Sequence, residues 1–217
     1  MRGRFVYDRA ELWADGVIHA SGIVLALVGV VALVTFFAPA SSSDLVPISV
    51  YCVGLLSVLV VSAAYNMWPV SPVKWWLRRC DHSAIFVLIA GTYTPFLARM
   101  SDGMAAQGMS ALLWTAALAG ILLKITRPGR YDRVTIGLYL AMGWSCVIIW
   151  DRVMMLPAAT LWLLVAGGIF YTGGVVFHLW HRLRFHNAIW HACVLVATAF
   201  HYAAVVSLVA APGVVSA

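Results

Sequence analysis

Charged residues are scarce in this sequence. Only 14 Lys and Arg and 8 Asp and Glu occur among 217 residues, or 10% of the chain, whereas a soluble domain carries about 25%. Hydrophobic residues make up 63%, and the mean hydropathy is +0.93. This composition excludes an ordinary soluble enzyme, a disordered chain and a nucleic-acid-binding protein with a basic face. It predicts an integral membrane protein.

Lysine and cysteine are also few. The two lysines, Lys74 and Lys124, lie in or beside predicted loops. This excludes a retinal protein, because the Schiff base needs a lysine buried in the bundle. The four cysteines form no CxxC pair and no secreted disulfide pattern. We interpret them as small buried hydrophobic residues.

The few charges separate seven apolar runs. Each run is near the roughly 20 residues that a helix needs to cross a bilayer. We therefore predict an all-α integral membrane protein, a single seven-transmembrane-helix bundle over residues 1–217. The predicted spans are 16–38, 45–67, 82–100, 104–124, 133–150, 156–179 and 187–210.

The distribution of Lys and Arg predicts the direction of the chain. With seven crossings, twelve of these residues fall in the N-terminal tail and the loops of one side, and only Arg99 and Arg152 fall on the other side. Positive residues concentrate in cytoplasmic loops. The N-terminus is therefore predicted to be cytoplasmic and the C-terminus to lie outside.

Polar residues within the predicted spans gather at their cytoplasmic ends. Three pairs are spaced i,i+4, so the members of each pair share a helix face. Polar groups inside a bilayer are costly, and their convergence predicts a functional chamber in the bundle. For a single pair, hydrogen bonding between helices is the alternative explanation. The residues are Asp15 and His19, Ser62 and Asn66, Asn187 and His191, with Asp81 and His82 opening the third span.

Four stretches carry a family signal, in order along nearly the whole chain. They are Glu11-x-x-x-Asp15-x-x-x-His19-x-x-Gly22, Ser62-Ala-Ala-Tyr65-Asn66, Asp81-His82-Ser83-Ala84-Ile85-Phe86 with the following 89–96, and Ala188-Ile189-Trp190-His191 with His201. Each resembles a motif of the bacterial hemolysin III family. That family belongs to the progestin and adipoQ receptor group, which includes the adiponectin receptors and is distantly similar to alkaline ceramidases.

The resemblance implies zinc near the cytoplasmic face, held by one His of the second helix and two of the seventh, and hydrolysis of a lipid amide such as a ceramide. His191 matches one of these ligands. Ser62 and Asp81 match the Ser and the Asp that attend the zinc-bound water, with Asp81 as general base. The other two ligand positions are Asn66 and Asn187, where the family has His.

This departure puts the cofactor in question, because zinc is normally held by Cys, His, Asp or Glu. One possibility is a rearranged zinc site in which His191 is joined by His19, Asp15 or Asp81. Asp15 stands where the bacterial pattern usually has Asn. His82 lies at the same depth and is a further candidate ligand.

The other possibility is a network without metal. Asparagine offers both donors and acceptors, so Asn66 and Asn187 are able to hydrogen-bond to His191 and Asp81. The corresponding function would be non-enzymatic: a membrane-homeostasis protein or lipid sensor, or a channel-like cytolysin. A channel would need polar residues through the full depth of the bundle, and the outer halves of the spans are nearly all apolar.

The expected partners follow from the same arguments. We expect membrane lipids, including an inner-leaflet lipid as substrate or ligand, and a second copy of the chain in a homo-oligomer. Nucleic acid is not expected. The family resemblance implies that the protein resides in the bacterial inner (plasma) membrane.

Overall fold

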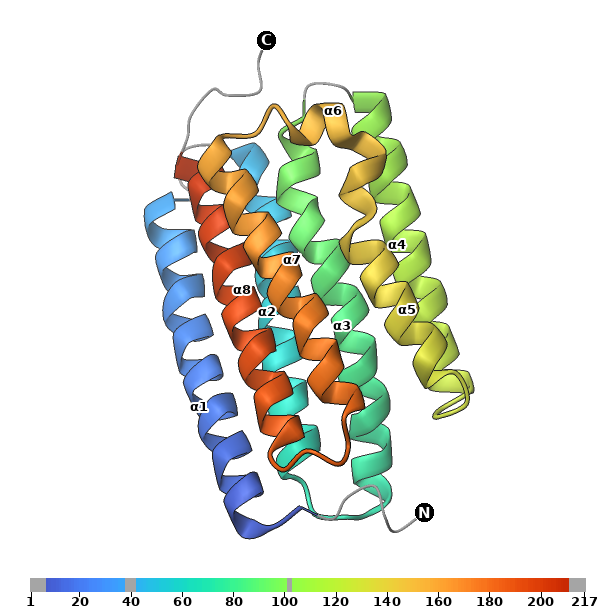
Figure 1. Cartoon of the computed structure of the whole chain (residues 1–217). Helices are drawn as coiled ribbons and strands as arrows, with labels where there is room; N and C mark the ends of the chain where they lie inside the picture. The colour runs from blue at the N-terminus through green and yellow to red at the C-terminus, as the bar shows by residue number, and fades with distance from the viewer. Residues whose placement is uncertain (1–6, 38–41, 101–102, 211–217) are drawn as a thin grey trace.

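The protein is a bundle of long helices (Figure 1). The computed structural model describes residues 7–37, 42–100 and 103–210, and it contains no strand within them. In chain order the elements are α1 (Arg9–Ala32), a π-helical turn (Leu33–Phe37), α2 (Ser42–Met67), α3 (Pro72–Ala98), α4 (Gly103–Thr126), α5 (Asp132–Gly143), a 3-10 segment (Ser145–Ile149), α6 (Trp150–Val153), α7 (Ala158–Leu179) and α8 (His186–Ala210).

Six helical segments are long and apolar enough to cross a membrane, which confirms a helical membrane protein. The predicted third span corresponds to α3, which has 27 residues but is not one of the six. A seventh crossing and the direction of the chain therefore remain predictions. The six segments are Arg9–Phe36, Asp44–Met67, Gly103–Thr126, Asp132–Val153, Ala158–Leu179 and His186–Ala210.

The third helix begins ten residues earlier than predicted, so the stretch from Lys74 to Arg79 is helical and not a loop. Ser71 caps the helix by accepting a hydrogen bond from the Lys74 backbone N–H, and a proline follows the cap. The Lys74 ammonium turns back and donates to the carbonyls of Asn66 (3.1 Å) and Trp68 (2.8 Å). A cation here satisfies carbonyls that the end of α2 leaves without helical partners. Lys74 is consequently buried.

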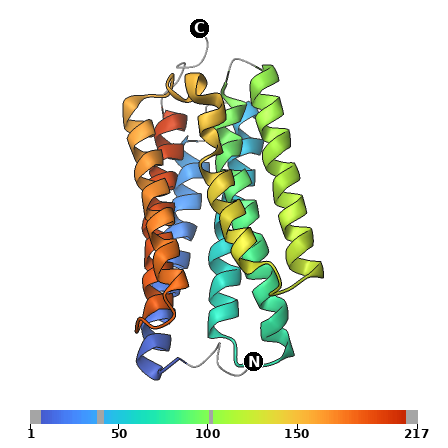
Figure 2. The same ribbon diagram turned by 45° about the vertical axis from the view of Figure 1, so that its right-hand side comes forward.

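The predicted fifth span, 133–150, is not one continuous helix. The α-helix stops at Gly143 and continues as a 3-10 segment (Figure 2, yellow to orange). The Tyr93 hydroxyl on α3 donates to the Gly143 carbonyl (2.7 Å) and accepts from the Cys146 N–H (3.0 Å). Backbone groups freed inside a membrane need such partners. Hydropathy could not predict this break, because it counts apolar residues and ignores the backbone.

Apolar packing is concentrated on two sides of the bundle. One cluster joins mainly α2, α3 and α8, with α1 packed against it, and a second joins α3, α4 and α5. In Figure 1, α1 and α4 lie at opposite edges of the bundle. Residues of α3, α5 and α7 line the cavity described below.

Gly120 on α4 is essential to the second cluster. A Cβ added there would lie 2.2 Å from Cζ of Phe86, which is fully buried. We expect Gly120→Ala to lower the free energy of unfolding by about 1–3 kcal/mol, the usual cost of overpacking a core. Thermal unfolding of the purified protein in detergent measures this change.

Gly108 on the same helix supplies the matched control. A Cβ there would meet no atom within 4 Å. Because alanine is the better helix former by up to about 1 kcal/mol, Gly108→Ala should leave the melting temperature unchanged or raise it slightly. Equal melting temperatures for the two variants would contradict the role given to Gly120.

Candidate functional site

Asp15, His19 and His191 meet in the interior of the bundle. Each offers one ligand atom, and these atoms lie within 4.8 Å of one another. His191 Nδ1 is 2.5 Å from Asp15 Oδ1, and His19 Nε2 is 3.7 Å from Asp15 Oδ2. Asp15 and His19 share one face of α1, while His191 comes from α8, which lies beside α1 (Figure 1). All three are buried.

The start of α1 is fixed by a capping box that also holds the α7–α8 turn. Asp8 accepts from the Glu11 N–H (2.8 Å), and Glu11 accepts in return from the Asp8 N–H (2.9 Å). The second oxygen of Glu11 accepts from the Phe185 N–H (3.0 Å), just before α8 begins. Glu11 therefore places the first turn of α8 against α1. The sequence identified Glu11 only as part of a motif.

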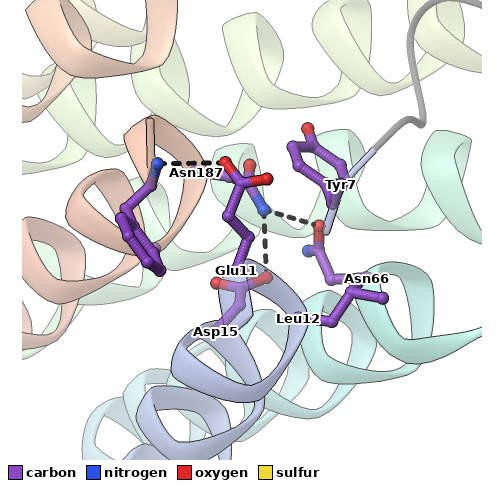
Figure 3. Close-up of a pocket in the computed structure, with 8 residues that line it drawn as sticks. Tyr7, Glu11, Leu12, Asp15, Asn66 and Asn187 are labelled. Carbon is purple, nitrogen blue, oxygen red and sulfur yellow. Dashed lines mark hydrogen bonds between the residues drawn. The ribbon is translucent and has the colours of Figure 1, made fainter. Parts of the chain in front are cut away.

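Asn66 and Asn187, which the resemblance aligns with two zinc ligands, are hydrogen-bonded to each other (Figure 3). Asn187 Nδ2 donates to Asn66 Oδ1 (3.1 Å) and to Asp15 Oδ2 (3.0 Å). Asn66 Nδ2 donates to the carbonyl (2.9 Å) and hydroxyl (3.3 Å) of Ser62, one turn earlier. The network without metal that the sequence allows, in which both asparagines bond to His191 and Asp81, is not the arrangement among the described residues. Instead, Asn187 connects Asn66 to Asp15, since it donates to both, and Asn66 donates to Ser62.

A small pocket borders these groups and is covered by Tyr7 (Figure 3). Burial, together with the nearby carboxylates of Asp15 and Glu11, raises the pKa of the Tyr7 phenol above its ordinary value. Tyr7 therefore stays a neutral hydroxyl at physiological pH.

Asp81 and Ser62 lie near the three-residue cluster. Asp81 is buried on α3, beside the Ser62 hydroxyl and within electrostatic reach of His191 and His19. His82, the next residue, is not part of the cluster. Its neighbours are the charged groups of Arg78, Lys124 and Asp132. The structure thus brings together all the predicted site residues except His82.

A large cavity extends from this site through the bundle. Its volume is about 1300 Å³, larger than the roughly 300–1000 Å³ of ordinary ligand pockets. Asp81 and His191 line its polar end, whereas residues such as Leu97 and Leu161 line the remainder. Trp162, which is 72% exposed, also lines it. Val147 of the fifth span also lines it and is 58% exposed, so the cavity opens between the fifth span and α7.

One hydrogen bond crosses this opening. Trp144, at the break of the fifth span, donates from its indole N–H to the Thr172 hydroxyl on α7 (3.1 Å). Its ring lies against Gly168, where an added Cβ would come within 3.1 Å. The break in the fifth span thus directs a tryptophan across the entrance. No sequence pattern indicated this contact, because its two partners are 28 residues apart.

His201, the deeper histidine of the last motif, has a structural role. Its Nε2 is 3.2 Å from the Leu164 carbonyl, and its ring occupies space beside Gly167. A Cβ at Gly167 would lie 2.2 Å from the His201 ring. Gly167 therefore leaves space for the His201 side chain.

Comparison with known proteins agrees with the motifs. The model of a family described as "Haemolysin-III related" matches residues 10–202. The hemolysin-3 homolog of Bacillus subtilis (strain 168) is 36% identical over 184 residues, which cover 84% of this chain and 86% of the relative. Hemolysin-3 of Bacillus cereus is 34% identical over 184 residues, 84% of each chain.

A human protein also matches. The monocyte to macrophage differentiation factor of Homo sapiens is 31% identical over 162 residues, which cover 72% of this chain and 67% of the human protein. The bacterial and human relatives both align over most of the helical bundle. The chain belongs to the haemolysin-III-related family of membrane proteins.

Proposed function

We propose that the protein is a zinc-dependent hydrolase that cleaves the amide bond of a membrane lipid. The observation that carries the proposal is the convergence of Asp15, His19 and His191 within 4.8 Å. This cluster adjoins the polar end of a cavity that opens toward lipid. In this proposal, Asp15 and His19 replace the two histidine ligands of the family that this chain lacks.

The residues of the cluster fit zinc chemically. Two imidazoles and one carboxylate form a ligand set known from catalytic zinc sites. His19 Nε2 is buried and makes no hydrogen bond to any described residue. A buried nitrogen in this position is costly unless it has a partner, and a metal ion would be one. Asn187 donates to Asp15 and would hold that carboxylate in place, as partners of metal ligands commonly do.

Asp81 and Ser62 would carry out the proton transfer and charge stabilisation. Zinc, when bound, lowers the pKa of a coordinated water to about 7 and polarises the amide carbonyl. Asp81 would act as the general base that takes a proton from the attacking water and as the acid that gives it to the leaving amine. The Ser62 hydroxyl donates a hydrogen bond to the carbonyl oxygen as charge develops there.

The shape of the cavity supports a lipid substrate. Exposed apolar residues such as Trp162 border this opening, as expected for an entrance from lipid. An acyl chain entering between α5 and α7 would lie along the apolar walls. Its amide would then reach the polar end, beside Asp81 and His191.

A second candidate function is a lipid sensor without catalysis. It is favoured by the hydrogen bonds that already connect Asp15 with His191, Asn187 and Asn66. A network of this kind satisfies most of its own polar groups. A channel is less favoured, because the cavity is largely lined by apolar residues away from its polar end.

The zinc content of the purified, detergent-solubilised chain distinguishes these functions. We expect about one zinc per chain by mass spectrometry, since a catalytic site of three protein ligands holds one ion. His19→Ala should reduce zinc to background. His181→Ala, an exposed histidine outside the cluster, is the matched control and should retain zinc.

The double variant Asn66→His/Asn187→His completes the test. It restores the family's ligand types at both positions. Zinc in this variant but not in the unaltered chain would overturn the proposed site and favour the sensor. Zinc in the unaltered chain that survives His19→Ala would show that other residues hold the metal.

A further inference from the structure

A second buried charged cluster lies at the same end of the bundle, formed by Arg78, Lys124 and Asp132. Arg78 Nη2 is 2.7 Å from Asp132 Oδ2, and Lys124 Nζ is 3.0 Å from Asp132 Oδ1. The side chains of Arg78 and Lys124 are only 11% and 5% exposed. They come from α3 and α4 and meet the first residue of α5. We call these three residues the basic cluster.

The basic cluster holds more positive than negative charge. Each oxygen of the single Asp132 carboxylate faces one cation, which leaves an excess of one positive charge. Asp81 is the other carboxylate that lines the cavity, whereas four Lys and Arg residues line it, so positive charge exceeds negative charge there. Uncompensated charge is expensive within a membrane protein. The excess of positive charge favours an anionic ligand at this end of the cavity.

The basic cluster faces the cavity. All three of its residues line the polar end, together with two further cations, Lys74 and Arg133. The apolar remainder of the cavity opens sideways toward lipid. One space thus combines a positively charged end with walls that suit an acyl chain. This combination matches an amphiphile with an anionic head.

We propose that the basic cluster binds the anionic head group of a lipid whose acyl chain fills the apolar part of the cavity. Arg78 offers a planar fork of donors that matches the oxygens of a phosphate or a carboxylate. Asp132 is paired with both Arg78 and Lys124, so an incoming anionic head group competes with this carboxylate for the two cations. If the chain is a hydrolase, its substrates are acidic lipid amides. That last step rests on the proposed function, whereas head-group binding does not.

Binding is tested on the purified full chain with single-chain lipids that share an oleoyl chain. The probes are lysophosphatidylglycerol, oleate and zwitterionic lysophosphatidylcholine, with inorganic phosphate as a head group alone. A ligand that binds the folded state raises the melting temperature in proportion to its affinity. We expect at least one acidic lipid to bind about tenfold more tightly than lysophosphatidylcholine, as for one charge-assisted hydrogen bond. Equal affinities would overturn the proposal.

The two acidic probes distinguish the source of the anion. Tighter binding of lysophosphatidylglycerol would indicate a phosphate-bearing lipid, and tighter binding of oleate would indicate a fatty-acid carboxylate. A response to inorganic phosphate alone at similar concentrations would mean that the acyl chain contributes nothing. That result would overturn the lipid part of the proposal.

Some variants are expected to weaken the preference for acidic lipid and one to strengthen it, so the test stays decisive even if one variant unfolds. Arg78→Gln and Lys124→Met should abolish the preference for acidic lipid. Asp132→Asn removes the competing carboxylate and should increase it. Arg127→Gln, the same charge change on an exposed residue outside the cavity, should leave it unaltered. A weaker preference in Asp132→Asn would contradict the assignment.

Head-group binding and hydrolysis can fail separately. Asp81→Asn should stop turnover but keep the preference for acidic lipids. Loss of the preference in Arg78→Gln with zinc still bound would support the basic cluster, whatever the fate of the proposed chemistry. A chain that hydrolyses acidic and zwitterionic lipid amides equally would uphold the hydrolase and reject the acidic substrate class.

Discussion

Replacing Asp81 by Asn is expected to lower lipid-amide hydrolysis by about 10²–10⁴-fold, the usual contribution of a general acid–base group. Asn has nearly the same shape as Asp but is unable to accept the proton of the attacking water. Zinc content should not change, because Asp81 is not among the three clustered ligands. The measurement is the rate of fatty-acid release from a short-chain ceramide and from an acidic lipid amide in detergent.

The control for this experiment is Asp151→Asn. Asp151 is exposed on α6, which lies at the end of the bundle away from the cluster (Figure 1). The Asp151→Asn substitution removes the same charge as Asp81→Asn and should leave turnover unaltered. If the Asp81 variant hydrolysed these lipids at the rate of the unaltered chain, Asp81 would not be the general base. If the unaltered chain itself did not hydrolyse these lipids although it contained zinc, the lipid-amide proposal would fail.

Removing Arg99 is expected to have the largest effect on stability. Arg99 follows α3 and binds Asp44 on α2 through two nitrogens, at 3.2 and 2.6 Å. It also donates to the carbonyl of Leu208 near the end of α8. The side chains of Arg99 and Asp44 are 19% and 14% exposed. One guanidinium thus connects three helices at the end opposite the candidate site.

Arg99→Met should lower the free energy of unfolding by about 3 kcal/mol, the low end of the range for breaking a buried ion pair. Arg99→Lys should cost less, because lysine keeps the charge but loses the two-nitrogen contact. Thermal unfolding of Arg99→Met, Asp44→Asn and the double variant measures the coupling between the two residues. Purely additive losses would mean that the ion pair contributes nothing.

The sequence predicted most of the fold because the membrane imposes strong rules on composition. Uncharged runs gave the long helices, and i,i+4 spacing indicated that Asp15 and His19 share a face. The start of the third helix was predicted wrongly. Three cations in the segment after Ser71 suggested a loop, whereas the Lys74 side chain turns inward to bind the end of α2.

The sequence predicted which residues form the site, but not which of them contact each other. Helical spacing shows which side chains share a face, but it does not show which atom of a neighbouring helix each one meets. The contact of Asn187 with Asp15 joins residues 172 positions apart. The contact of Arg78 with Asp132 joins α3 to α5 across 54 positions. Such contacts depend on how the helices are rotated against one another, which a single sequence does not specify.

The break of the fifth span has a mechanical consequence. A continuous α-helix resists bending, because a bend stretches several of its backbone hydrogen bonds at once. After Gly143 the regular ladder is already interrupted, and the Tyr93 hydroxyl on α3 supplies two of the missing contacts. This wall of the cavity therefore consists of two helical segments joined at a point that bends more easily than a continuous helix. The side chain at this point, Trp144, is the one that spans the entrance.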